Sequence, residues 1–302
     1  MNAPASRYAA RGRVLMLASA LFFIANVLLV RAIGTHFAVD TWMLSSVRFL
    51  IGLGLVFLPL MPGGAVNLRS LWRNPLVIAR GVIGGSAVAI FYATIPELGA
   101  GRATFVNNTY ILWGALLAAL FLREHLQARM VVALLLGLLG VGLLTGVSAH
   151  GWAFSRADAL AILGAVFSAI VIVIIRRLRE HETIATIFGS QCAWGLAFTA
   201  VPTVTGWQTP GWLAAALLAL AGLLAGAGQL FMTAGYRWLP VAEGSLLQMS
   251  VPVGIALGGV VFFQERYSLA ELIGASLIIG SCVLGAMTRP RIAGALPKDF
   301  QR

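Results

Sequence analysis

Apolar residues occur along the chain in long unbroken runs, and short polar or charged stretches separate one run from the next. Each run is about 20 residues long, which is the length of a helix that crosses a bilayer. The strands of a membrane barrel would alternate polar and apolar positions over about 10 residues instead. The pattern predicts an all-α membrane protein with ten transmembrane helices, over residues 14–33, 41–60, 76–95, 103–122, 130–147, 157–175, 184–203, 212–234, 241–263 and 269–287.

The sequence carries an internal repeat. LFFIANVLLVR, which ends at Arg31, resembles VFSAIVIVIIR, which ends at Arg176. The fourth and ninth predicted spans both end in a short charged turn, where Glu124 is followed 141 residues later by Glu265. We therefore expect two five-helix halves, residues 1–150 and 151–302. Because five is an odd number, the second half would enter the membrane from the opposite side, as in transporters with inverted repeats.

The distribution of the net charge of +11 predicts an orientation. With the N-terminus in the cytoplasm, 16 of the 21 Lys and Arg residues lie on the cytoplasmic side, 4 lie on the other side and Arg48 lies inside a span. This bias follows the positive-inside rule, so we expect both termini in the cytoplasm and the chain, with its first span uncleaved, in the cell inner membrane. No basic run is interleaved with aromatic residues, so we expect no nucleic-acid partner.

Composition excludes several classes of protein. The chain is 60% hydrophobic and 10% charged, whereas soluble domains carry about 25% charged residues. All the acidic and histidine residues lie at or near predicted span ends, so no midspan carboxylate is available to relay protons or bind sodium. There is no Walker loop, zinc-ligand motif or intramembrane Ser/His pair, so we expect no metal, no cofactor and no catalytic residue. Cys192 and Cys282 lie inside predicted spans, and we expect no disulfide.

Three of the amides inside predicted spans are candidate substrate ligands. Asn108 lies in the fourth span and Gln248 in the ninth, each about a turn and a half from the end at which its span begins. The two repeats therefore bring polar groups toward the midplane from opposite sides, where inverted-repeat transporters bind substrate. Asn26 in the first span is the third amide. The alternative for all three is a hydrogen bond that joins neighbouring helices.

Aromatic and charged residues complete the candidate site. Tyr92, Tyr110 and Trp113 lie deep in their spans, where they can stack on an apolar or aromatic substrate, or simply pack against other helices. Arg48 either holds a substrate carboxylate or bonds carbonyls at a helix end. Pro252 frees a backbone carbonyl one turn earlier, which makes it a candidate hinge.

The charged turns carry a resemblance to a known family. An apolar helix that ends in FLREHL or FFQERY and is followed by a Gly-rich span resembles the EamA-type members of the drug/metabolite transporter superfamily. Arg48 in LSSVRFLIGLGL also fits the second-helix arginine usual there, whereas Arg123 stands where a Gly is usual. The resemblance implies a secondary carrier, frequently an exporter of amino acids or related metabolites, with a central cavity lined by the first, third, fourth, sixth, eighth and ninth helices.

These observations predict an exporter of amino acids, with aromatic or apolar ones as candidates, or of related small metabolites. We expect it to work by alternating access, with its substrate and the lipid bilayer as its partners. Because no midspan group titrates, the sequence favours facilitated diffusion or exchange, and proton coupling through Glu97 or Glu243 stays open. The alternatives are an exporter of nucleosides, purines or drug-like cations and, from another class, a membrane-embedded enzyme. The enzyme would need a cluster of His and acidic residues at one membrane face, and Glu124 with His125 is the only such pair.

Overall fold

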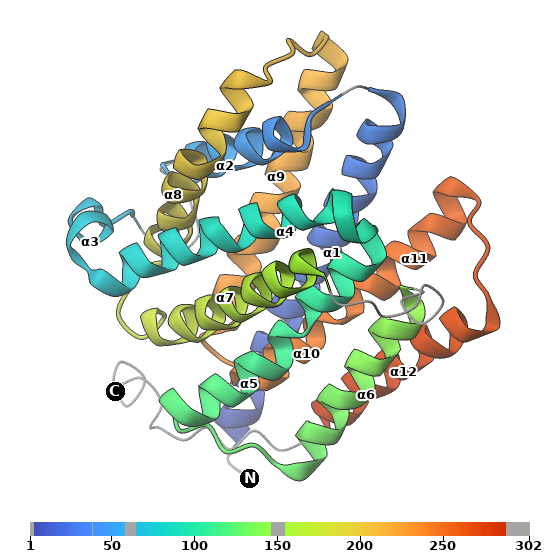
Figure 1. Cartoon of the computed structure of the whole chain (residues 1–302). Coiled ribbons are helices and arrows are strands. Elements are labelled where there is room, and N and C mark those ends of the chain that lie inside the picture. The colour runs from blue at the N-terminus through green and yellow to red at the C-terminus, as the bar shows by residue number, and fades with distance from the viewer. Residues whose placement is uncertain (1–2, 38, 58–64, 146–154, 288–302) are drawn as a thin grey trace.

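The computed structural model describes residues 3–37, 39–57, 65–145 and 155–287, and these ranges contain helices and connecting turns but no strand. The fold is therefore all-α, as predicted (Figure 1). The helices are α1 (Ala3–His36), α2 (Thr41–Val56), α3 (Leu68–Arg73), α4 (Pro75–Asn108), α5 (Tyr110–Phe121), α6 (Ala128–Leu144), α7 (Arg156–Leu178), α8 (Ile184–Thr205), α9 (Trp212–Gly235), α10 (Val241–Gln248), α11 (Ser250–Phe263) and α12 (Leu269–Ala286).

The helices contain an apolar segment for each predicted span. Seven segments are long and apolar enough to cross a membrane, and three more, residues 42–56, 75–91 and 128–144, are shorter apolar helices. Some predicted boundaries lie outside the described residues: the end of the second span at residues 58–60, the end of the fifth at residues 146–147, and the boundary between the halves at residue 150. The chain is thus a multi-pass membrane protein of about ten helices.

Two helices depart from the predicted spans. The ribbon of α4 turns back within its length, so that its last residues continue toward α5 (Figure 1). The apolar segments on either side of this turn are residues 75–91 and 103–121, which match the separate third and fourth spans. The short helix α3 occupies part of the predicted loop at residues 61–75, because Asn67 accepts a hydrogen bond from the Ser70 amide and caps it.

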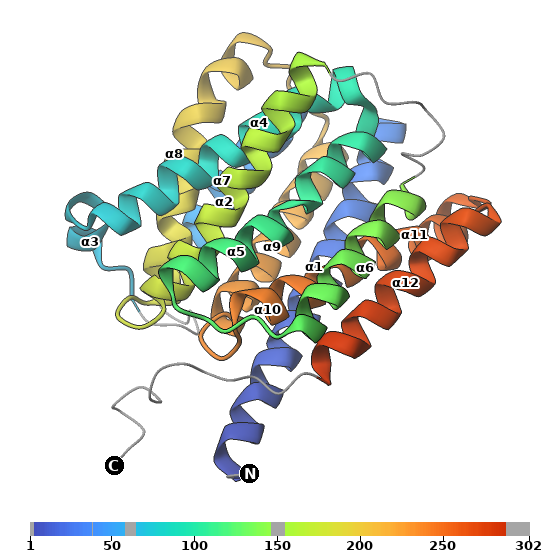
Figure 2. The same cartoon turned by 60° about the horizontal axis from the view of Figure 1, so that its bottom comes forward.

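Helices far apart in the sequence pack in pairs. The most extensive packing joins α6 with α12, α4 with α7, α1 with α9, α4 with α8 and α2 with α8. Figures 1 and 2 both show α6 and α12 side by side at one edge of the bundle. A Cβ atom on Gly140 would lie only 2.6 Å from the Gly274 carbonyl oxygen, so glycine at both positions lets these two backbones approach closely.

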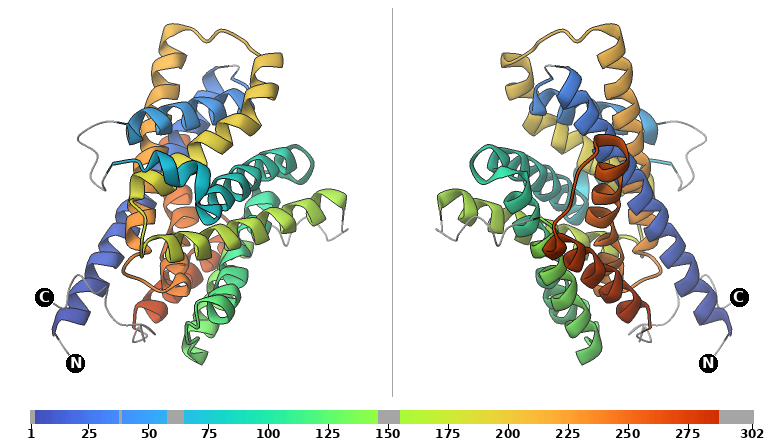
Figure 3. Two further views of the ribbon diagram at one scale, coloured as in Figure 1. Left: turned by 90° about the vertical axis from the view of Figure 1, so that its left-hand side faces the viewer. Right: turned by 90° about the vertical axis from the view of Figure 1, so that its right-hand side faces the viewer.

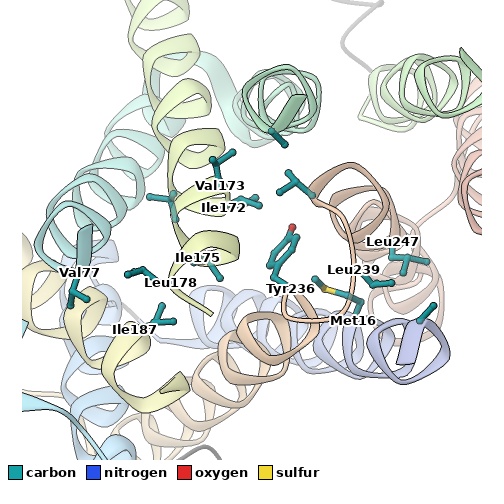
Figure 4. Close-up of a cluster of buried hydrophobic side chains, with 14 residues drawn as sticks. Met16, Val77, Ile172, Val173, Ile175, Leu178, Ile187, Tyr236, Leu239 and Leu247 are labelled. Atoms are coloured by element: carbon teal, nitrogen blue, oxygen red, sulfur yellow. The ribbon is translucent and has the colours of Figure 1, made fainter. Parts of the chain in front are cut away.

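The bundle has two ends that carry the repeated charged turns. We call the end where α5 stops and α10 begins the Glu124 end, and the end where α11 stops the Glu265 end. The first turns of α1 extend past the other helices at the Glu124 end (Figure 3). An apolar cluster fills the bundle here, with members from α1, α4, α5, α7, α8 and α10. Figure 4 shows Tyr236 in this Glu124-end cluster, between Ile175 on one side and Met16 on the other.

Candidate functional site

Two helices are each interrupted for a single residue, Thr109 or Met249, at positions that the internal repeat relates to within one residue, and both residues keep right-handed helical φ and ψ. The helix of the fourth span stops at Asn108 and restarts as α5, and the helix of the ninth span stops at Gln248 and restarts as α11. At the first break the Thr109 hydroxyl donates to the Val106 carbonyl over 2.6 Å. At the second, the Ser250 hydroxyl donates to the Leu247 carbonyl over 2.7 Å. Broken helices at such related positions form the substrate and ion sites of many transporters.

The predicted amides lie at or near these breaks but bond to protein groups. Asn108 donates its side-chain N–H to the Thr104 carbonyl of its own helix over 2.8 Å. Gln248 is buried and donates to the Ser19 hydroxyl over 2.9 Å, which ties α10 to α1. Asn26 donates to the Ala221 carbonyl over 2.8 Å and ties α1 to α9. Each amide N–H thus has a partner, and the structure does not bring Asn26 and Asn108 into one group.

The predicted aromatic residues occupy different environments. Tyr110 packs against the Glu124-end cluster and also against a second apolar cluster formed by α5, α6, α10, α11 and α12. Trp113, one turn later in α5, is 40% exposed. The backbone of Tyr92 lies in α4, but its side chain is outside the described part of the structure.

Pro252 lies next to the second break, whereas Arg48 lies in another helix, α2. Pro252 lies inside α11, three residues beyond Met249, where the ninth span is interrupted. Because proline has no N–H, residue 252 cannot donate the usual α-helical hydrogen bond to the Gln248 carbonyl, four residues earlier. Arg48 is half-buried in α2 and forms no ion pair with any acidic residue in the described ranges.

Arg80 is a buried cation that the sequence pattern assigned to a span end. Its side chain is 1% exposed, and its Nη2 donates to the Gln191 side-chain oxygen over 2.8 Å. Its Nε and Nη1 atoms have no hydrogen-bond partner. Arg80 follows Pro75 by five residues, so the sequence signal was an arginine more than a turn inside an apolar span with no acid beside it.

Glu124 joins three helices at the Glu124 end. Its carboxylate accepts a hydrogen bond from the backbone N–H of Val241, the first residue of α10, over 2.9 Å. The same carboxylate lies 3.5 Å from Nε of Arg176 in α7. Burial raises the pKa of the Glu124 carboxyl above its usual value of 4.5, although Arg176 and the Val241 amide act in the opposite direction.

Glu265 makes a related contact at the other end. Its carboxylate bonds the guanidinium of Arg31 in α1, and it accepts a hydrogen bond from the Tyr267 hydroxyl over 2.7 Å. These two contacts lower the pKa of the Glu265 carboxyl below its usual value of 4.5, Arg31 having the larger effect. The residue before each glutamate, Arg123 or Gln264, has φ of 56°, so both turns pass through the left-handed region.

A third carboxylate is buried beside the Glu124 end. Glu243 in α10 is 1% exposed and accepts a hydrogen bond from Arg13 Nε over 2.7 Å. Its second oxygen has no partner. Glu97, the other acid considered for proton coupling, is exposed in α4. Among the described residues, no group of three His, Cys, Asp or Glu side chains is placed to hold a metal ion.

Comparison with known proteins decides the family. The sequence model of the EamA-like transporter family matches residues 10–146 and again residues 155–287. The chain belongs to the EamA-like transporter family. Because the EamA-like match occurs twice and covers most of the chain, it agrees with a duplicated fold, and it makes the chain a transporter rather than an enzyme. The resemblance inferred from the charged turns is confirmed at the level of the family.

Individual relatives of this EamA-like chain are distant. An uncharacterized transporter of Helicobacter pylori strain J99 is 26% identical over 216 residues, which cover 69% of this chain and 72% of that protein. The pseudopaline exporter CntI of Pseudomonas aeruginosa is 24% identical over 287 residues, which cover 91% of this chain and 95% of that protein. One solved crystal structure matches with a TM-score of 0.77 at 21% identity, over 91% of this chain and 96% of its own, and shows a shared fold.

Proposed function

We propose that this transporter exports amino acids, with a preference for apolar or aromatic ones, or related small metabolites, by alternating access in the cell inner membrane. The two halves are inverted repeats, and both termini lie in the cytoplasm. The positive-inside bias supports this orientation, because 16 of the 21 basic residues then lie on the cytoplasmic side. The Glu124 end is then cytoplasmic and the Glu265 end faces outward.

The observation that carries the proposal is the pair of broken helices. Thr109 and Ser250 are 141 residues apart and make the same hydroxyl-to-carbonyl hydrogen bond. In an inverted repeat the two breaks meet near the midplane, where each leaves backbone polar groups and a neighbouring side chain available to a substrate. Asn108 and Gln248 would exchange their protein partners for the polar end of the substrate, and Tyr110, Tyr92 and Trp113 would contact its side chain.

The packing at the two ends supports a cycle in which one end is closed at a time. At the Glu124 end α5 packs against α10, and the Glu124-end cluster fills the space between the halves. At the Glu265 end α4 and α11, which are the counterparts of α10 and α5, make at most marginal contact within the described residues. The arrangement fits a carrier that is closed toward the cytoplasm and open toward the outside.

A relative supports the direction of transport. The Pseudomonas aeruginosa protein named pseudopaline exporter CntI aligns with nearly the whole chain. Export of nucleosides or purines stays an alternative, whereas drug-like cations are disfavoured because Arg48 and Arg80 bring positive charge into the bundle without an acidic partner in the described ranges.

The proposal is tested with purified protein in liposomes. Uptake of a panel of radiolabelled amino acids is measured with and without a proton gradient, and saturable uptake of apolar or aromatic amino acids is expected. The double variant Asn108→Ala, Gln248→Ala should lose most uptake at normal expression. Gln208→Ala, which changes an exposed amide between α8 and α9, is the matched control and should transport normally. If no amino acid enters under either condition, amino-acid export is wrong.

Glu243 offers a specific test of coupling within the same assay. Its buried carboxylate has one oxygen without a partner and is the best-placed acid for a proton in the described structure. If transport is proton-coupled, Glu243→Gln should remove the dependence on the gradient and Glu97→Gln should not. Uptake that needs no gradient in the wild type would instead establish facilitated diffusion or exchange.

A further inference from the structure

Arg80 is buried in the bundle without a counter-ion. Its guanidinium has one hydrogen bond, to the neutral amide of Gln191, and leaves Nε and Nη1 without partners. A buried charge that no opposite charge balances is among the costliest features that a membrane helix can carry. No acidic side chain in the described ranges pairs with it. Such a group is expected where a ligand supplies the missing charge.

The surroundings of Arg80 accommodate its guanidinium. A Cβ atom on Gly84, one turn later in α4, would lie 2.2 Å from Arg80 Nη1, so only glycine leaves the room that the head group occupies. A second positive charge lies on a neighbouring helix, since Arg48 stands one turn before Gly52 of α2, and a Cβ atom on Gly52 would lie 2.5 Å from the Cys192 sulfur, beside Gln191 in α8. Helices α4 and α2, which carry the two arginines, both pack against α8, which carries Gln191.

The position of Arg80 along the bundle relates it to the proposed transport path. Val77 belongs to the Glu124-end cluster, and Arg80 follows it by three residues on the same helix face. Val171 of α7, another member of that cluster, lies 3.6 Å from the Cβ position of Gly84. Arg80 thus lies at the inner limit of the Glu124-end cluster, which is the closed side of the transport path in the proposed cycle.

We propose that Arg80 binds the carboxylate of the transported molecule, with Gln191 orienting the guanidinium and Arg48 adding to the attraction. The inference rests on the proposed function and adds to it the chemical group that the carrier recognises. A planar guanidinium is well matched to a carboxylate, and the hydrogen bonds between them are charge-assisted. A substrate without a carboxylate would leave the buried charge unbalanced and should be rejected.

The test compares each amino acid with its amide, which keeps the amine and side chain but lacks the negative charge; L-phenylalanine and L-phenylalaninamide are the first pair. Thermal unfolding of the purified protein measures binding, and liposome uptake measures transport. The wild type should be stabilised by amino acids and not by their amides. Arg80→Gln should weaken the binding of amino acids by about tenfold or more, the range expected when a hydrogen bond to a charged group is lost.

Two further variants separate recognition from structural damage. Arg179→Gln removes another buried guanidinium, at the turn between α7 and α8, and should leave selectivity for the acid unchanged. Arg80→Lys keeps the charge and should retain more binding than Arg80→Gln. Without ligand, Arg80→Gln should unfold at the same temperature as the wild type or higher, because it removes an unbalanced buried charge.

The outcomes distinguish this inference from the proposed function. Equal stabilisation by acid and amide, or unchanged selectivity in Arg80→Gln, overturns the role of Arg80 even if amino acids are transported. Arg80-dependent binding of carboxylates without any uptake supports the role of Arg80 and contradicts amino-acid export. Failure of every amino acid to stabilise the wild type more than its amide overturns the inference outright.

Discussion

The two charged turns, Arg123–Glu124 and Gln264–Glu265, are nearly identical in backbone and different in surroundings. Both pass through a residue with φ of 56°. In each, the amide of the glutamate donates to a carbonyl six residues earlier, Ala118 or Gly259, over 3.2 and 3.1 Å. Each carboxylate also meets an arginine of the other half, Arg176 or Arg31. The repeat therefore reproduces both the turn and the ion pair.

The difference lies in what else each carboxylate contacts. Glu124 accepts the first N–H of α10 and is 12% exposed, whereas Glu265 accepts the Tyr267 hydroxyl of its own turn and is 32% exposed. The N-terminus of a helix favours a negative charge, so the Glu124 contact fastens α5 to α10. Both glutamates form an ion pair with an arginine, but only Glu124 also binds the start of a helix from the other half. A carrier that is closed at one end only is expected to show this difference between two copies of the same turn.

The largest predicted difference between the two ends is in the stability lost when each glutamate is replaced by alanine. Glu124→Ala leaves Arg176 and the Val241 amide without their acceptor in a buried position, and a loss of about 3 kcal/mol is expected. Glu265→Ala breaks a more exposed pair and should cost less than about 1 kcal/mol. Thermal unfolding of both variants in detergent measures the difference. Equal losses would show that the two ends are equally closed.

A smaller difference is expected between variants at the two helix breaks, measured as the loss of transport. Thr109→Val and Ser250→Ala each remove a hydroxyl-to-carbonyl hydrogen bond worth about 1 kcal/mol. The second break is also supported by Pro252, whose counterpart in the first half is Ile111. Transport should therefore fall more in Thr109→Val, by several-fold, than in Ser250→Ala. A larger effect of the Ser250 variant would contradict the view that the hydroxyl maintains the first break.

The smallest predicted effect is a pair of opposite pH dependences. Because the pKa of Glu124 is raised in the folded state, the folded protein binds this proton more tightly than the unfolded chain does. The resulting stabilisation is fully present below pH 4.5, the pKa of the unfolded chain, and is lost as the pH rises through the folded pKa. Because the pKa of Glu265 is lowered in the folded state, its ionised carboxylate stabilises the fold above pH 4.5. That stabilisation is lost as the pH falls through the folded pKa. The unfolding temperature of the wild type minus that of Glu124→Gln should decrease as pH rises from 4 to 7. The same difference for Glu265→Gln should increase as pH rises between 3 and 5, and slopes of the same sign would be inconsistent with these environments.

Much of the fold follows from the sequence because the length of an apolar run is fixed by the bilayer. The apolar segments and the internal repeat were accessible from composition and spacing, and the family from the resemblance of the charged turns. The break at Thr109 was not, because a single hydroxyl bonding to a carbonyl three residues earlier leaves no mark on an apolar run. The break at Met249 lies three residues before Pro252, the residue from which a hinge in the ninth span was predicted. Helix α3 was also missed, since it depends on one capping asparagine in a short polar stretch.

The candidate site was predicted less completely for a physical reason. The partners of buried polar groups are distant in sequence: Arg80 bonds Gln191 across 111 residues, and Gln248 bonds Ser19 across 229. A basic residue near the start of a span is ordinarily a charge at the membrane surface, so Arg80 was assigned there. Only packing shows that its head group turns inward. Glu243 was likewise placed at a span end, but it is buried against Arg13.

The most direct test of the account is a pair of distances measured by spin labels in liposomes. One pair of labels, at Arg123 and Arg237, spans the Glu124 end, and the other, at Glu97 and Gln264, spans the Glu265 end. Introducing Glu124→Ala should lengthen the first distance and shorten the second, because opening one end closes the other. If both distances stay the same, or if both lengthen together, the two ends do not alternate and the account is wrong.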